Sequence, residues 1–334
     1  MTRGRGARGS LLIVTLWLIT ILSALAIAVG RYLSLELKIA KYHTARKQAA
    51  ALARGGVYLA MARLADDGAE EDSRMYDWLG DDDWARWTTP DPQDPETGLV
   101  ALGAQGMAAP RGVVRIRTVD EERKVSLNGL PGAQDVWFNA AGALLQSPTL
   151  AAAIEDYADS ETPPLPSHGQ GLEFDEASNP RYLAKNGPLA APEELWEIPG
   201  VAAVPAEVLA AFLAQTSVYT AQPMLNINTV SPEVLAAMGL SEQNAQGLAD
   251  CRERGTIFTD KAEIWNTAVD HGCLATPGAQ EQALLTNHFD VVSNTFTISS
   301  EGRLEPSGVS VRMEAVVKRE GSGARPRILA WRER

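Results

Sequence analysis

The side chains most suggestive of chemistry are carboxylates on either side of a loop rich in proline and glycine. Their positions are Asp156, Asp159, Glu161, Glu173, Asp175 and Glu176. Hard oxygen ligands that converge from a loop are those that Ca²⁺ takes in proteins, commonly with backbone carbonyls completing the shell. An ordinary solvated acidic loop has the same composition, and such loops are frequent in this chain. The residues alone therefore leave a calcium site and a solvated loop both open.

A second candidate is the pair of cysteines, Cys251 and Cys273, the only two in the chain. In a reducing cytosol we expect two buried thiols, whereas an oxidising compartment makes the pair a disulfide candidate. Closing so short a loop stabilises a folded chain by about 3 kcal/mol. The compartment therefore decides between the two states, and the N-terminal segment decides the compartment.

Catalytic chemistry has little support in the sequence. The four histidines are scattered, and neither the zinc motif His-Glu-x-x-His nor the hydrolase motif Gly-x-Ser-x-Gly is present. The pattern Gly-x-Gly-x-x-Gly at residues 4–9 follows no strand, so it lacks the context of a dinucleotide site. We therefore predict that the protein is not an enzyme.

An uncharged, apolar stretch runs from Ser10 to Gly30 and is long enough to cross a bilayer as a helix. Basic residues precede it at Arg3, Arg5 and Arg8, and the first acidic residue is Glu36. The positive-inside rule then leaves the short tail in the cytoplasm and takes the bulk of the chain across the membrane. The sequence predicts a single-pass membrane protein with most of its mass on the far side of the membrane from the cytoplasm.

Three interpretations of this stretch remain. It could be a cleaved signal peptide, since small residues recur near Ala26, or a plain anchor, or a leader of the prepilin type cut between Gly9 and Ser10. The third is favoured because the helical pattern continues without proline to about Ala65, which predicts a helix roughly 80 Å long. Apolar residues at four-residue spacing carry that pattern: Ala45, Ala49, Ala53, Val57, Met61 and Leu64.

Strand patterns flank a long region that is mainly helical. Residues 113–118 and 124–128 read as an antiparallel hairpin, and residues from 289 to 331 read as a meander with turns at 301–302, 306–308 and 320–323. A hairpin alone is marginal in water, so we expect one sheet that is completed by the later strands. The distal half of the long helix should cover its apolar face.

The region between these strands contains two similar units, near residues 192–201 and 232–240. Each places a proline where a helix starts and a glycine in a short turn before a second helix, as in helix-hairpin-helix units. DNA binding by such units needs an excess of basic residues, but here acids offset the basic residues and the formal charge of the chain is −12. We therefore expect packing units and no nucleic-acid partner.

With these pieces assembled, the chain resembles the general secretion pathway protein K family, the large minor pseudopilins of type II secretion systems. The resemblance covers nearly the whole sequence. It depends on RG/SLLIVTLWLITILSALA at the cut, Asp120-Glu121 before KVSLN, YLAKNGPLAAPEELWEIPGV, PMLNINTVSPEVLAAM and HFDVVSNTFTISSEGRLE. The fifth residue after the cut is Val14, where most pilin-like subunits carry glutamate, and an apolar residue there suits a subunit with no neighbour ahead of it.

The resemblance implies an α+β fold, in which a pilin-like long N-terminal helix packs on an antiparallel sheet interrupted by a large, mainly α-helical insertion with helix-hairpin-helix-like units. It implies cleavage and N-methylation by the prepilin peptidase and a complex with the minor pseudopilins I and J. Family members bind calcium near the acidic loop, which favours Asp156, Asp159, Glu161 and Glu173 as ligands. This chain departs from the family pattern at Glu161 and at Gly171-Leu172-Glu173.

The expected organisation is a leader at 1–9, a transmembrane segment at 10–30, a first pilin-like part at 31–129, an insertion at 130–285 and a second pilin-like part at 286–334. The expected function is to nucleate and cap a periplasmic pseudopilus. Alternatives are a periplasmic binding module released by signal peptidase, or a membrane-tethered DNA-uptake protein. The residues expected to contact partner helices are Leu33, Leu37, Ala45, Ala49, Ala53, Val57, Met61 and Leu64.

Overall fold

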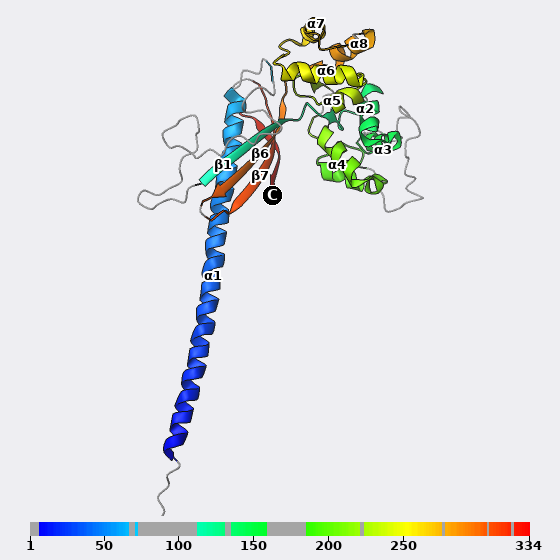
Figure 1. Ribbon diagram of the computed structural model, residues 1–334. Coiled ribbons are helices and arrows are strands. Elements are labelled where there is room, and N and C mark those ends of the chain that lie inside the picture. The colour runs from blue at the N-terminus through cyan, green and yellow to red at the C-terminus, as the bar shows by residue number, and fades with distance from the viewer. Residues whose placement is uncertain are drawn as a thin grey trace, which may run out of the picture.

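The protein consists of a long helical rod that carries a folded head, in which a sheet lies against the rod and a helical insertion lies beside the sheet (Figure 1). The structure is a computed structural model. It describes the residues 7–66, 71–72, 112–130, 135–158, 185–220, 224–275, 278–305, 307–321 and 324–334, with side chains from residue 11 onward.

The rod is helix α1, which runs from Ala7 to Asp66 without a break. Its 60 residues span about 90 Å. The segment contains no proline and is rich in alanine, leucine and other good helix formers, so nothing in it favours an interruption. The prediction of one helix that continues from the apolar stretch to about Ala65 is confirmed.

The sheet has four antiparallel strands in the order β1-β6-β7-β8. Their bounds are β1 Gly112–Asp120, β6 Thr295–Leu304, β7 Ser310–Lys318 and β8 Arg327–Glu333. Even-numbered residues of β6 and odd-numbered residues of β7 are buried beneath α1, as the two-residue period of a strand requires. The predicted meander is confirmed for β6, β7 and β8, and β1 adds to its open edge through β6. Its expected first segment, from residue 289, lies outside this sheet, because Phe289–Asp290 pairs with Leu225–Asn226.

The predicted hairpin of residues 113–118 and 124–128 is wrong. Strand β1 pairs with β6, so that Gly112 faces Leu304, while Val125–Ser126 forms β2 and pairs in parallel with β3 at Thr216–Ser217. The reason is that Val125 and its apolar neighbours are buried in the core of the insertion. Strand β1 ends where the chain leaves the sheet.

The predicted turn at Glu301-Gly302 is also wrong, because β6 continues through it to Leu304. Gly302 lies where α1 crosses the strand in close contact. A Cβ atom there would press against the backbone of Ala49 and Ala53. The glycine is needed for close helix–sheet contact, a reason that looks like a turn signal in the sequence.

The insertion contains helices and short strands. These are α2 Asp135–Leu145, α3 Pro148–Ala158, η1 Pro192–Glu197, η2 Val201–Ala203, α4 Ala206–Gln215, β4 Leu225–Asn226, α5 Pro232–Ala237, α6 Glu242–Glu253, η3 Lys261–Glu263, α7 Ile264–Asp270, α8 Ala279–His288 and β5 Phe289–Asp290. Strand β4 pairs in parallel with β5.

Both predicted helix-hairpin-helix-like units form, but one is built from α-helices and the other from 3₁₀ helices. Helices α5 and α6 meet through a turn in which Gly239 has a φ of 113°, and Ser231 and Ser241 cap the two helices. The first unit is made of the short 3₁₀ helices η1 and η2, with Gly200 at a φ of 92° between them.

The head has two hydrophobic cores. One joins α1 to the sheet, and the other fills the insertion around Trp137, Phe212 and Phe258. Val125 and Val291 belong to the second core, so the insertion extends on both sides beyond the expected bounds of 130 and 285. It begins after Asp120 and ends before Thr295.

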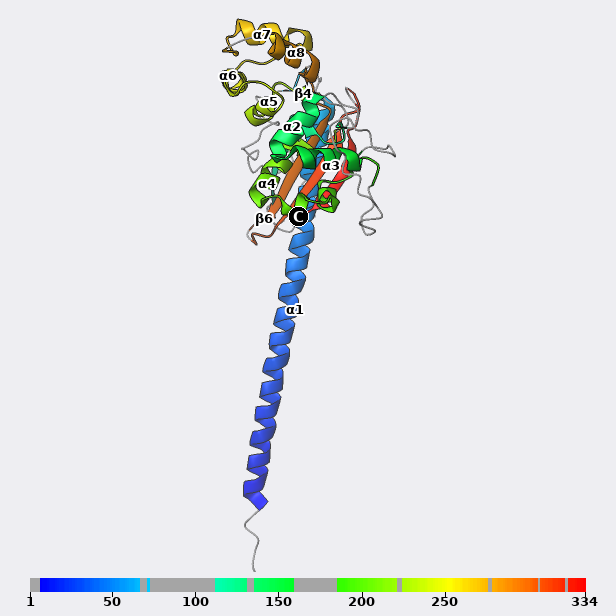
Figure 2. The same ribbon diagram turned by 90° about the vertical axis from the view of Figure 1, so that its right-hand side faces the viewer.

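The insertion lies over the face of the sheet opposite α1. Figure 1 shows α1 and the insertion on opposite sides of the strands, and Figure 2, turned by 90°, shows α2, α3 and α4 in front of them. Arg332 of β8 reaches across from this face to Glu193 and Tyr219 of the insertion.

Replacing Gly302 by alanine should separate the rod from the sheet. The added methyl group meets helix backbone, which cannot move aside like a flexible side chain, and overpacking of this kind costs about 1–3 kcal/mol. Urea unfolding of the full chain in neutral detergent should show the loss. Gly30→Ala is the matched control, since nothing lies within 4 Å of that position. Equal stability of the two variants would refute the close-contact role.

Candidate functional site: the apolar rod and the buried junction

The N-terminal half of α1 exposes an unbroken apolar surface. Large apolar side chains from Leu11 to Val29 are each at least 49% exposed, and Leu12 reaches 73%. In the part of the chain that the structure describes, α1 is the one helix long and apolar enough to cross a membrane. So large an apolar surface requires lipid or protein around it.

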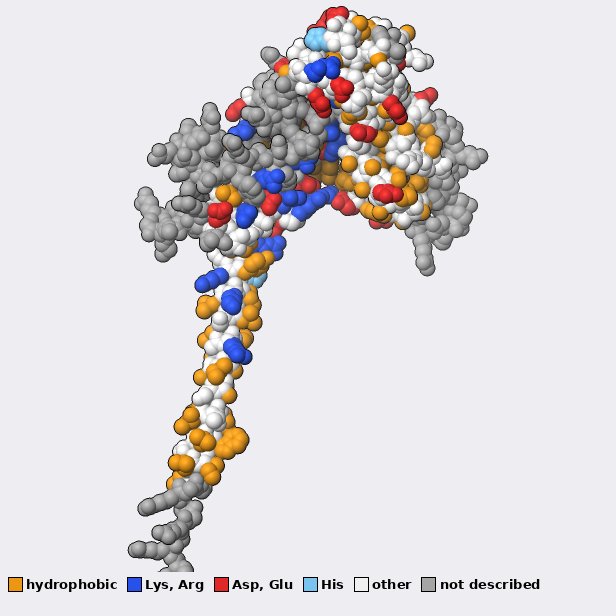
Figure 3. Space-filling view, viewed as in Figure 1, with side chains coloured by type: hydrophobic (Ala, Val, Ile, Leu, Met, Phe, Trp, Pro, Cys, Tyr) orange, Lys and Arg blue, Asp and Glu red, His pale blue; other side chains and the backbone are white. Residues whose placement is uncertain are grey.

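Beyond Gly30 the rod stays exposed but becomes mixed in character. Leu33 and Leu37 are 55% and 63% exposed, and Lys38 and Lys41 follow them closely in sequence. Figure 3 shows hydrophobic and basic side chains mixed along the upper part of the rod. Ala45 is partly buried against the sheet. This stretch presents both apolar and charged groups to any helix that lies alongside.

The expected partner contacts need a correction in the distal half of the rod. Ala49, Ala53, Val57, Met61 and Leu64 are at most 3% exposed, because they pack on the chain's own sheet. They are occupied within the molecule and cannot contact a partner helix in this arrangement. The expectation of partner contacts therefore narrows to Leu33, Leu37 and the exposed side of the rod near Ala45.

A buried polar cluster holds the point where the chain leaves the sheet for the insertion and returns from it. Its central ion pair joins Arg319, just after β7, to Asp72, which follows α1 in sequence. The guanidinium and carboxylate are 2.9 Å apart, and both side chains are at most 1% exposed. Asp72 also accepts a hydrogen bond from the backbone N–H of Ser293. We call this cluster the junction.

Asp120, the last residue of β1, receives three hydrogen bonds in the junction. Its carboxylate accepts from the hydroxyl of Thr229 at 2.5 Å, from the hydroxyl of Ser293 at 2.6 Å and from the backbone N–H of Glu122 at 2.8 Å. These donors come from the insertion, from the returning chain and from the departing chain. One carboxylate thus joins all three segments.

Asn226 of β4 completes the junction with its side-chain amide. The Nδ2 group donates to the backbone carbonyl of Asp72 at 3.0 Å and to the hydroxyl of Ser293 at 2.8 Å. Its Oδ1 atom accepts from the backbone N–H of Asn228. The side chain is fully buried, so each of these bonds is formed away from water.

Burial raises the pKa of three junction carboxyls. It raises the pKa of Asp72 to about 6 despite the nearby Arg319. It raises the pKa of Glu122 to about 8, with the charge of Asp120 adding to the effect, and it raises the pKa of Asp120 as well. Burial also opposes ionisation of Glu121, but the Lys124 ammonium 2.7 Å away outweighs it, and the pKa is lowered.

The predicted calcium ligands lie almost entirely outside the described residues. Asp156 is within α3, whereas Asp159, Glu161 and Glu173 fall outside the ranges that the structure describes. Among the described side chains there is no group of three or more that could hold a metal ion. The calcium site stays a prediction, as does processing at Gly9 and Ser10.

The structure joins Cys251 and Cys273 in a disulfide. The bond links α6 to the segment that follows α7. Gly247, one turn earlier in α6, lets the helix come close to the backbone carbonyl of Cys273, which a side chain at that position would overlap. The disulfide is thus part of the insertion core, where both cysteines are 1% exposed.

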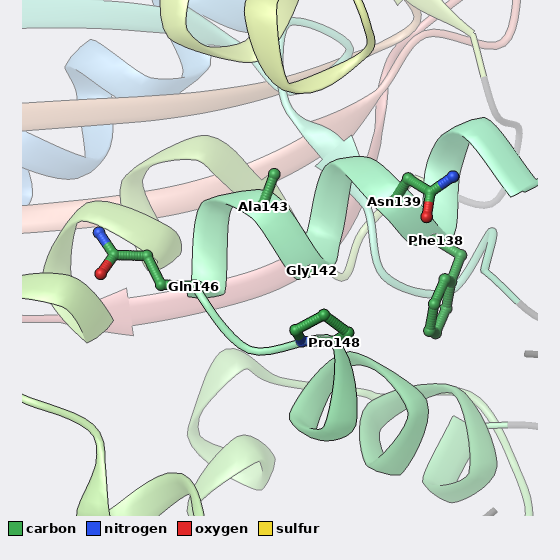
Figure 4. A pocket seen from close by; sticks show the side chains of 6 residues that line it. All are labelled: Phe138, Asn139, Gly142, Ala143, Gln146 and Pro148. Carbon is green, nitrogen blue, oxygen red and sulfur yellow. The ribbon is translucent and has the colours of Figure 1, made fainter. Parts of the chain in front are cut away.

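A pocket of about 350 Å³ lies between α2 and the start of α3. Figure 4 shows Phe138 projecting from α2, Pro148 at the start of α3 and Gln146 just beyond the other end of α2. Its lining contains no acid, base or nucleophile, so the pocket offers no catalytic chemistry. Among the described residues, the candidate functional features are therefore the apolar surface of α1 and the junction.

Sequence reasoning missed the junction. The segment Asp120-Glu121-Glu122-Arg123 is polar and follows a strand, so it reads as a solvated turn. Three acids in a row at the end of a strand give no sign that the partners of the first are a threonine and a serine far away in sequence. Arg319 also stands in a strand-end position typical of a surface residue.

Comparisons with known proteins agree with this architecture. The family model of type II secretion system (T2SS) protein K matches residues 225–284. A solved chain from the structure titled "The Crystal Structure of the GspK-GspI-GspJ complex from enterotoxigenic Escherichia coli Type 2 Secretion System" shares 16% identity with a TM-score of 0.58, covering 90% of this chain and 98% of that one. No curated protein sequence matches significantly. The family match and the shared fold together support the resemblance to protein K.

Replacing Arg319 by methionine should destabilise the head strongly. It leaves Asp72 buried without its counter-charge, and loss of one partner of a buried pair costs about 3–5 kcal/mol. The measurement is urea unfolding well above the pKa of Asp72. Arg327→Met is the matched control, because its pair with Glu320 is 60% and 50% exposed and should cost at most about 1 kcal/mol. Similar losses in both variants would show that the junction is not a special feature.

Glu122 should make the stability of the head depend on pH. A carboxyl with a raised pKa in the folded state favours folding below its unfolded pKa, and this contribution is lost as the pH rises through the folded value. The window for Glu122 runs from 4.5 to about 8. Glu122→Gln should therefore gain stability relative to the unmodified protein across this window. The exposed control Glu207→Gln should follow the unmodified protein, and a Glu122→Gln curve parallel to it would contradict the assignment.

Proposed function

We propose that the chain is a minor pseudopilin of a type II secretion system that assembles with counterparts of GspI and GspJ. The observation that carries the proposal is the protein K match at residues 225–284, located in a chain that shares the fold of a component of the GspK-GspI-GspJ complex over 90% of its length. The match falls in the insertion, which distinguishes this architecture from a rod and sheet alone.

The exposed rod supports a role in assembly. An apolar surface from Leu11 to Val29, followed by an exposed stretch with Leu33 and Leu37, has the length and character to pass from membrane into contacts with neighbouring helices. The sheet already covers the distal third of the rod. Partner helices can therefore contact the proximal part of the rod, including the side that faces away from the sheet.

The position of the insertion supports placement at the tip of the fibre. It lies to one side of the rod, over the sheet, and adds bulk that is hard to repeat along a thin helical fibre (Figure 1). Val14 is 57% exposed and uncharged, so it makes no demand for a compensating charge from a subunit ahead. Both features suit a subunit that nucleates and caps a periplasmic pseudopilus.

Processing by a prepilin peptidase fits the continuous helix. A cut between Gly9 and Ser10, followed by N-methylation, keeps the rod and makes Ser10 its first residue, whereas a signal-peptidase cut near Ala28 removes about the first third of α1. We include in the proposal an inner-membrane anchor, a periplasmic head in which the disulfide forms, and a calcium site at Asp156, Asp159, Glu161 and Glu173.

The test is to co-express the full chain with its prepilin peptidase and the candidate minor pseudopilins I and J, then to purify it from detergent-solubilised membranes. The mature chain should begin at Ser10, and both partners should co-purify. Leu33→Glu with Leu37→Glu should weaken recovery of the partners severalfold, because charge enters an apolar contact. The matched control is Arg54→Glu with Arg63→Glu, on exposed positions of the distal rod.

A mature chain that starts near Val29, or one that starts at Ser10 but never retains either partner, would contradict the proposal. Calcium is tested separately by repeating the purification with a chelator. Loss of the partners on chelation would support a structural metal, and unchanged recovery together with unchanged unfolding would argue against it.

A further inference from the structure

We propose that basic side chains on α1, just beyond its apolar part, bind the anionic headgroups of phospholipids in the membrane that the helix crosses. These residues are Arg31, Lys38 and Lys41, which we call the basic stripe. The inference rests on the membrane anchor of the proposed function, but it does not depend on the pseudopilin partners or on the fibre. An apolar helix alone does not distinguish one headgroup from another, so the proposal adds a lipid class.

The helical repeat places the three residues on one side of the rod. Lys38 is seven residues after Arg31, which is about two turns, and Lys41 is about one turn further on. The same seven-residue step from Lys38 leads to Ala45, which packs against the sheet. The basic stripe therefore lies on the side of the rod that carries the sheet, in the stretch below the head.

The basic stripe carries positive charge that no acid compensates within the described part of the chain. Its three side chains are exposed and make no ion pair with a described residue. Glu36 is the only acidic residue in the stretch 31–65, and none of the residues three or four positions away from it is basic. Lys38 and Lys41 lie one turn apart, where like charges repel each other. An anion bound between them would relieve this repulsion.

The apolar segment determines how far the basic stripe lies from the membrane. Residues 11–30 span about 30 Å as a helix, which equals the thickness of the hydrocarbon core of a bilayer. Arg31 then lies at the boundary of the core, and Lys38 and Lys41 lie about 12 and 17 Å beyond Gly30 along the axis. Tyr32 is 63% exposed at the level of Arg31, where aromatic residues are frequent in membrane proteins.

The lysines are within electrostatic range of the headgroups. Side chains of a helix lean toward its N-terminus, which here is toward the membrane, so both ammonium groups lie closer to the bilayer than their Cα atoms do. The headgroup layer extends about 5–8 Å beyond the core, and its charge acts over a further 8–10 Å or so at physiological salt. All three basic groups therefore lie in or directly above the headgroup layer.

Continuity with the apolar segment favours the membrane as the binding partner of the basic stripe. The stripe begins at the residue that follows this segment, and Figure 3 shows Lys and Arg side chains on the rod between its hydrophobic end and the head. These groups are at headgroup level whenever the helix is in a bilayer, whereas an acidic protein would have to reach beneath the head. Each Lys or Arg near an anionic membrane surface strengthens binding about fivefold.

The experiment titrates the full chain in neutral detergent with anionic phosphatidylglycerol, or with zwitterionic phosphatidylcholine of the same acyl chains, and counts bound lipids by native mass spectrometry. Phosphatidylglycerol should bind more tightly, and its advantage should shrink as the ionic strength rises. Lys38→Gln combined with Lys41→Gln should weaken phosphatidylglycerol binding about five- to thirtyfold. Binding of phosphatidylcholine should stay unchanged in this variant.

The matched control is Lys47→Gln combined with Arg54→Gln. It removes the same charge from exposed positions on the opposite side of the rod and farther from the apolar segment, and it should change binding less than twofold. Lys38→Arg combined with Lys41→Arg keeps the charge and should keep the binding. The arginines of the leader are present in every variant, so differences between variants report on the basic stripe.

Equal binding of the two lipids by the unmodified chain, or equal weakening in the control pair, would overturn the proposal. Loss of pseudopilins I and J from the Lys38→Gln and Lys41→Gln variant with lipid binding intact would also overturn it, because the stripe would then be a protein contact. A chain that does not fractionate with membranes would remove the anchor from the proposed function as well. An anchored chain without a lipid preference would refute the basic stripe alone.

Discussion

The ion pair between Asp72 and Arg319 is the interaction on which the arrangement of the head depends. A chain that leaves a sheet, builds a separate core and returns to the same sheet needs one place where both crossings are fixed. Here that place is the junction, which also includes Asp72 from the segment after the rod. The rod, the sheet and the insertion are therefore connected at one buried cluster. The charges are out of water and depend on one another and on a ring of neutral hydrogen-bond donors.

The junction explains how the rod can set the orientation of the insertion. Helix α1 is held to the sheet by small side chains and by close backbone contact at Gly302, and the sheet is held to the insertion by the junction and by the bonds of Arg332. The rod and the insertion are therefore linked through the sheet by these two sets of contacts. The orientation of the insertion follows from that of the rod.

The sequence predicted those features that depend on local pattern. The long helix follows from a run of helix formers without proline, and strands β6 to β8 follow from alternation, because both signals lie within a few residues of one another. For the two cysteines, the sequence alone left both a disulfide and a pair of buried thiols open. The pairing of β1 with β6 was not predictable in this way, since its partner lies some 180 residues later and the nearer segment at Val125 looked equally suitable. The same distance hid the junction, whose members are polar residues with ordinary local surroundings.

The separation of β1 from β6 has a consequence for how the molecule is made. The rod is synthesised well before the strands that cover Ala49, Val57 and Leu64, with the whole insertion between them in the chain. Until then the insertion can close its own core, but the rod and β1 have no sheet to join, and closing so long a loop is a slow, non-local step. Closing the sheet therefore depends on a contact between β1 and β6 across the whole insertion, and the insertion must bring its two ends together for that contact to form.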